Sequence, residues 1–125
     1  MSNELERTGK ILIYQNEKGD TKVDVYFTED TIWMTQRTMA DLYQTTPQNI
    51  TSHIKNIYED GELDLEATCK DFLQVQNEGG REVRRERKFY NLDMILAVGY
   101  RVRSNVGIHF RKWATGILTE YMKKG

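Results

Sequence analysis

The residues best suited to do chemistry are polar side chains at the start of a predicted helix. Gln48, Asn49 and Ser52 fall in its first turns, because Thr46 can accept backbone N–H bonds as the N-cap and Pro47 suits the first helical position. Glutamine and asparagine amides can form paired hydrogen bonds with adenine, and serine can bond to several base edges. This is the chemistry of reading DNA sequence, although each residue alone is also a common solvated helix residue.

These side chains would lie on the second of two short helices joined by a tight turn, which is the pattern of a helix-turn-helix. Thr35 can cap the first helix, which is expected to run to about Gln44, and the second is expected over residues 47–58. Ala40 stands where the two helices must approach closely, and Gln44 occupies the region of the usual turn glycine. An ordinary pair of core helices stays open as the alternative. The expected buried residues are Met39, Leu42 and Tyr43, then Ile50, Ile54 and Ile57.

A basic hairpin is predicted after this pair of helices, with strands over residues 72–77 and 81–90. A three-residue loop, which sets Val75 opposite Val83, is preferred over a two-residue loop because it keeps apolar residues on one face. A basic hairpin beside a helix-turn-helix is typical of a winged helix, whose wing follows the phosphate backbone. A charged edge hairpin that prevents aggregation is the alternative. The basic residues are Arg81, Arg84, Arg85, Arg87 and Lys88, against Glu82 and Glu86.

The distribution of charge along the chain supports a basic surface. Residues 1–76 carry 14 acidic and 7 basic residues, a balance of −7, whereas residues 77–113 carry 4 acidic and 9 basic residues, a balance of +5. Arg101 and Arg103 flank a helix junction where a phosphate or an acidic partner could dock, or where cations could cap a helix. A chain of net charge −1 can therefore present a DNA-facing surface, unless the charges are only scattered over solvated surface. The candidate interface also includes Arg37, His53 and Lys55.

The sequence gives little support for an enzyme, a metal site or a cofactor. His53 and His109 have no acidic or nucleophilic partner by spacing, and Gly79-Gly80 is a turn rather than a phosphate-binding loop. The single cysteine, Cys69, cannot form an internal disulfide. No apolar run approaches the ~20 residues of a membrane span, and the first residues do not form a secretory signal. We therefore expect a cytoplasmic binding protein without catalytic residues.

The remaining elements are expected to build the rest of the domain. Residues 1–9 are predicted to be a disordered tail, and residues 10–15 and 22–27 a β-hairpin. Asn91 is expected to cap a helix that ends near Val102, and a last helix follows. That helix has a continuous apolar stripe of Val106, Phe110, Trp113, Ile117 and Tyr121, and the expected core anchors are Trp33 and Trp113.

Five strings of residues resemble the RhuM family, a group of bacterial proteins named as virulence-associated. They occur in order as WMTQ at 33–36, NITSHIKNIYEDGEL at 49–63, VQNEGGREVRRERKFYNLD at 75–93, GYRVRSN at 99–105 and FRKWAT at 110–115. The part from YNLD to FRKWAT is also similar to the phage and viral Bro-N domain. Bro-N and KilA-N domains are regarded as DNA-binding regulatory modules, so the resemblance implies DNA binding. RhuM-family proteins are typically longer, which implies a C-terminal effector domain as a possible partner.

We therefore expect an α+β, winged helix-turn-helix-like domain over residues 10–125, with two hairpins and two C-terminal helices. Its expected function is to read duplex DNA as a homodimer in a bacterial or phage-derived regulator. Helix 47–58 would enter the major groove, and hairpin 72–90 would contact phosphates. The alternative is a protein-interaction domain that docks or restrains the effector domain.

Overall fold

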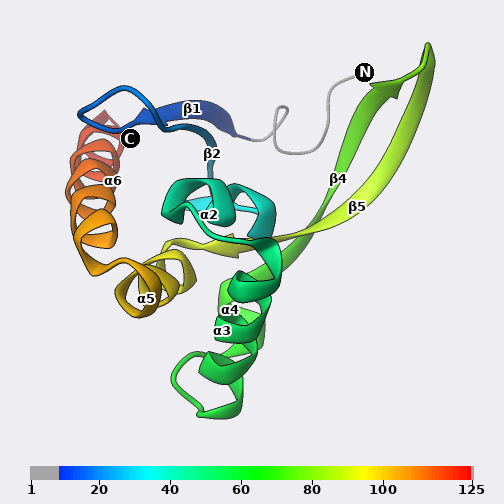
Figure 1. The fold of residues 1–125 in the computed structure, drawn as a ribbon. Helices are drawn as coiled ribbons and strands as arrows, with labels where there is room; N and C mark the ends of the chain where they lie inside the picture. Colours follow the sequence, from blue (N-terminus) through cyan, green and yellow to red (C-terminus); the bar gives the residue numbers. More distant parts are fainter. Residues whose placement is uncertain (1–8, 125) are drawn as a thin grey trace.

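The protein has an α+β fold organised by an antiparallel five-stranded sheet (Figure 1). The structure, a computed structural model, describes residues 9–124 except the side chains of residues 75–76 and 122–124. The strand order is β1-β2-β3-β5-β4. The strands are β1 Lys10–Gln15, β2 Lys22–Thr28, β3 Thr31–Met34, β4 Cys69–Glu78 and β5 Arg81–Asn91. The helices described are α2 Gln36–Tyr43, α3 Pro47–Glu59, α4 Leu65–Thr68, α5 Leu92–Val102 and α6 Ser104–Lys124. The tail predicted over residues 1–9 lies outside the described residues except for Gly9.

The two faces of the sheet differ in what covers them. One face packs against the helices and forms the main core, to which the sheet contributes Val25, Met34 and Tyr90, all buried. The other face carries a smaller aromatic cluster of Trp33, Phe72 and Phe89, with Tyr26 packed beside it. Within the described part of the chain this cluster contains no helix residue. We call the first face the helix side and the second the open face.

Three helices begin where side-chain caps were predicted. The Thr35 hydroxyl accepts the N–H of Thr38 at 3.2 Å and starts α2. The Thr46 hydroxyl accepts the N–H of Asn49 at 3.1 Å and starts α3, with Pro47 as its first residue. Asn91 caps α5 in the same way. These caps satisfy N–H groups that the first helical turn leaves without partners, and the predicted helix starts are confirmed.

The turn between α2 and α3 has glutamine, not glycine, at its left-handed position. Gln44 adopts the left-handed backbone conformation, with φ +54°, and the Thr45 N–H donates to the carbonyl oxygen of Ala40 at 2.9 Å. A residue other than glycine adopts this conformation at a cost of roughly 1–2 kcal/mol, which the surrounding core must offset. All six apolar residues predicted to be buried in the two helices are buried.

Two elements, the strand β3 and the short helix α4, were not predicted, and the predicted register of the second hairpin was wrong. The loop of the second hairpin has two residues, so that Val75 lies opposite Arg84 and not opposite Val83. Gly79 and Gly80 both have positive φ, of 58° and 81°. Two such residues form the tight turn that matches strand twist, and this turn sets the register in place of apolar alternation.

The β2–β3 turn offers a way to stabilise the protein. Glu29 and Asp30 have φ values of 53° and 62°, a conformation that favours glycine and asparagine. We expect Asp30→Gly to raise the free energy of unfolding by about 0.5–1 kcal/mol, because it removes the strain at the turn. A chemical denaturation curve measures the change. Asp24→Gly, inside the neighbouring strand β2, is the control and should lower stability. Equal destabilisation by both variants would contradict the prediction.

Gly99 allows α2 to approach α5 closely, and Gly107 of α6 lies against Gly99. A Cβ atom at Gly99 would lie 2.7 Å from the ring carbon Cζ of Tyr43 and closer still to its hydroxyl oxygen. One at Gly107 would lie 3.4 Å from the Gly99 carbonyl carbon. The Tyr43 hydroxyl donates to the carbonyl oxygen of Ile95 at 2.6 Å. The absence of a side chain at Gly99 therefore leaves space for the Tyr43 ring, whose hydrogen bond to Ile95 connects α2 to α5.

Candidate nucleic-acid interface

The outer face of α3 is polar and exposed. Its buried stripe of Ile50, Ile54 and Ile57 faces the core, which leaves Gln48 and Ser52 exposed on the other side. Asn49 is half-buried, and its amide nitrogen donates to the Thr45 hydroxyl at 2.9 Å. Gln48 and Ser52 are therefore better placed than Asn49 to reach an external base edge.

Other candidate residues near this helix pair differ in their surroundings. Lys55 is exposed, with its ammonium 4.0 Å from the Glu59 carboxylate on the same face of α3. Arg37 is exposed near the start of α2, whereas His53 is half-buried. Exposed ion pairs of this kind contribute little to stability, so Lys55 can exchange Glu59 for a phosphate at small cost.

A chain of side-chain hydrogen bonds connects α3 to the sheet through α2. The Thr51 hydroxyl of α3 donates to the Gln36 side-chain carbonyl at 2.9 Å, and the Gln36 amide nitrogen donates to the Tyr90 hydroxyl oxygen at 3.1 Å. Burial raises the pKa of Tyr90 to about 12, so the hydroxyl stays neutral under physiological conditions. Both ends of the Gln36 amide therefore take part in hydrogen bonds that connect α3 to β5, and the Thr51 hydroxyl also lies 3.0 Å from the Pro47 carbonyl oxygen of its own helix. Gln36 was not among the predicted site residues.

Strands β4 and β5 form a long arm, residues 69–91, that projects from the body of the protein (Figure 1). The arm carries all five basic residues predicted for the wing, and all five are exposed. Arg85 is paired with Glu78, with 2.9 Å between guanidinium and carboxylate. The helix pair and the arm thus present two separate groups of candidate residues.

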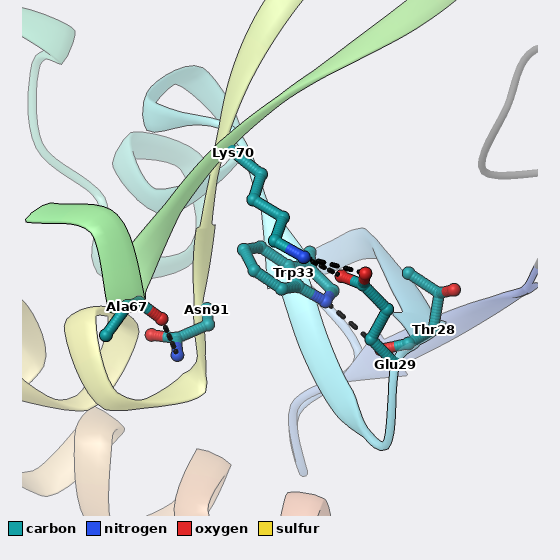
Figure 2. Close-up of polar contacts among 6 residues, drawn as sticks. All are labelled: Thr28, Glu29, Trp33, Ala67, Lys70 and Asn91. Carbon is teal, nitrogen blue, oxygen red and sulfur yellow. Dashed lines mark hydrogen bonds and ion pairs between the residues drawn. The ribbon is translucent and has the colours of Figure 1, made fainter.

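The base of the arm is fixed to the sheet by polar contacts on the open face (Figure 2). The Lys70 ammonium lies 2.7 Å from both carboxylate oxygens of Glu29 and 5.7 Å from the centre of the Trp33 ring. The Trp33 indole N–H donates to the carbonyl oxygen of Thr28 at 3.1 Å. On the other side of the base, the Asn91 amide nitrogen donates to the Ala67 carbonyl oxygen at 3.2 Å. These contacts limit the motion of the arm where it leaves the body.

The two arginines at the α5–α6 junction hold other parts of the protein. Arg101 lies 2.6 Å from the carboxylate of Glu62 and 3.9 Å from that of Asp60, and so ties α5 to the segment after α3. Arg103 donates to the side-chain carbonyl of Gln44 at 3.4 Å, next to the turn between α2 and α3. Arg101 thus contacts the segment that follows α3, and only Arg103 contacts the helix-turn-helix itself.

The described residues offer few groups for metal binding or for thiol chemistry. Among the described residues no three His, Cys, Asp or Glu side chains are grouped in a way that could hold a metal ion. Burial raises the pKa of the Cys69 thiol, which lowers its reactivity at neutral pH. None of the helices in the described ranges has the length and apolar character to cross a membrane.

Comparison with known protein families gives a match for the C-terminal part of the chain. Residues 67–125 match the Virulence protein RhuM family, so the resemblance seen in the sequence is confirmed over this segment. The match includes the arm, α5 and α6, whereas α2 and α3 lie outside it. No curated protein and no solved structure matches the chain.

Proposed function

We propose that this chain, whose residues 67–125 match the RhuM family, binds duplex DNA as a winged helix-turn-helix. In this proposal α2 and α3 form the helix-turn-helix, α3 enters the major groove and the arm is the wing. The observation that carries the proposal is the chain of hydrogen bonds through Gln36, which connects the polar helix α3 to Tyr90, at the base of the basic arm. A protein needs a connection between two such elements to contact bases and phosphates of one duplex together.

The contacts would divide into two kinds. Gln48 and Ser52 have amide and hydroxyl groups that can bond to base edges, and they lie in the first two turns of α3. The arginines of the arm would contact phosphates, which adds affinity without sequence preference. Sequence reading and backbone binding would therefore come from different elements.

The proposal extends to assembly and location. One module of this kind buries only roughly 600–1,000 Å² on DNA, which favours a homodimer that binds two half-sites. A regulator of bacterial DNA would act in the cytoplasm. Any effector domain after residue 125 would be positioned by this dimer on its target.

The central test is a salt titration of binding to random duplex DNA. Five to seven phosphate contacts would give a log–log slope of about −4 to −6 for the binding constant against salt. Fluorescence anisotropy with a labelled duplex measures both affinity and slope. The absence of binding at ~50 mM salt, where counterion release is strongly favourable, would overturn the proposed function.

A further inference from the structure

The charges of the arm are sorted between its two faces by the pleat of the strands. Side chains alternate along a strand, and residues directly opposite each other share a face. Phe89 belongs to the open face and Tyr90 to the helix side, so the register assigns a face to every charged residue of the arm. The open face carries Lys70, Arg81, Arg85 and Arg87 against Glu78, and the helix side carries Arg84 and Lys88 against Asp71, Glu82 and Glu86. Formal charge is therefore +3 on the open face and −1 on the helix side.

The basic residues of the open face differ in what holds them. Lys70 is bound to Glu29, and Arg85 is paired with Glu78. Within the described part of the chain, neither Arg81 nor Arg87 takes part in an ion pair. These two guanidinium groups can bind an external anion without first breaking an internal pair.

The arm holds these two arginines apart, and the aromatic cluster supports the strand at Arg87. Arg87 lies opposite Phe72 and two residues from Phe89, which are both buried in the aromatic cluster of the open face. Phe72 and Phe89 pack edge to face with ring centres 5.5 Å apart. Arg81 lies six residues further along β5, a distance of about 20 Å at ~3.3 Å per residue. The two side chains must therefore contact different phosphates.

We propose that the arm binds the phosphate backbone of DNA with its open face only, through Arg81 and Arg87. This inference rests on the proposal that the protein binds DNA, and it sets the open face of the arm, opposite the helix side on which α3 packs, against the phosphates. The helix side of the arm, with its acidic excess, faces away from the phosphates. The five basic residues predicted for the wing are thereby divided into a binding group and a group that does not bind.

The test compares two double variants that each remove two positive charges. Arg81→Gln with Arg87→Gln changes the open face, and Arg84→Gln with Lys88→Gln changes the helix side. Each phosphate contact contributes about −0.9 to the log–log slope, so the open-face variant should have a slope shallower by about 1.8. Its affinity for random duplex DNA at ~50 mM salt should fall by about 100-fold. The helix-side variant should keep a slope within about 0.5 of the original protein. Circular dichroism melting of both variants checks that they remain folded.

The outcomes separate this inference from the proposed function. If the original protein binds and both variants lose affinity and slope equally, the arm acts through overall charge and the inference is wrong, while DNA binding stands. If neither variant changes the slope, the arm does not touch the duplex and the inference is also wrong. If the original protein does not bind at all, the proposed function fails, and the inference fails with it.

Discussion

Phe110→Ala is expected to lower the free energy of unfolding by roughly 3–5 kcal/mol, as truncation of a fully buried aromatic side chain does. Phe110 is 0% exposed and lies in the first half of α6, where its ring contacts Tyr14 edge to face with centres 5.1 Å apart. The variant removes one of two aromatic side chains of α6, the other being Trp113, that pack on Tyr14 of β1. Loss of several kcal/mol is a large part of the stability of a small domain. A urea titration followed by circular dichroism measures the change.

Trp113 provides the comparison for Phe110. The sequence predicted Trp113 as a core anchor, but it is only partly buried, with its ring 5.2 Å from that of Tyr14. Trp113→Ala should therefore destabilise the protein less than Phe110→Ala does, although tryptophan is the larger residue. A larger loss for Trp113→Ala would show that the partly exposed ring carries more of the packing energy, and would contradict the prediction.

Gly99→Ala is expected to destabilise the protein by about 1–3 kcal/mol, although alanine is normally the better helix former. The added methyl group would overlap the Tyr43 ring and displace the hydroxyl from the Ile95 carbonyl oxygen. Overpacking of this kind costs roughly 1–3 kcal/mol, and the lost hydrogen bond adds about 1 kcal/mol. Together these terms exceed the helix-propensity gain of about 1 kcal/mol. Equilibrium unfolding in urea is again the measurement.

Two further variants make the Gly99 result specific. At Gly116, also within a helix, a Cβ atom would meet nothing within 4 Å. Gly116→Ala should therefore stabilise the protein by up to about 1 kcal/mol, the opposite sign. Adding Tyr43→Phe to Gly99→Ala removes the atom nearest to the new methyl group, and the double variant should recover part of the lost stability. Gly99→Ala with wild-type stability would show that Tyr43 moves aside without cost.

The helix starts could be predicted because each depends on neighbouring residues. Thr46 and Pro47 define the start of α3 within two positions, and the cap is made by the side chain next to the N–H groups it satisfies. The isoleucine stripe of α3 likewise depends only on spacing along one helix. The first hairpin, β1 and β2, was predicted for the same reason, from two apolar runs around a glycine turn.

The register of the arm and the contacts of its arginines could not be predicted in the same way. A shift of one residue moves every side chain to the other face, and the deciding feature was the pair of glycines at the turn. The third strand, β3, was not predicted because its four residues are too few to show the alternation of apolar and polar residues that indicates a strand. The sequence placed Arg101 at a helix junction, where it could bind a phosphate or an acidic partner or cap a helix, yet its partner Glu62 lies 39 positions earlier in the chain. Such pairings depend on the tertiary fold.

The link between α2 and the later elements has a consequence for the order of folding. The Gln36–Tyr90 contact spans 54 positions, and the Tyr43–Ile95 contact spans 52. Closing loops of this length costs chain entropy before the contacts form, which slows folding relative to proteins with mainly local contacts. During synthesis α2 and α3 leave the ribosome long before α5, so the part of their apolar surface that packs against α5 stays without that partner until residue 95 has emerged. A ribosome-stalling series should therefore show protease resistance of α2 only in nascent chains that have released α5.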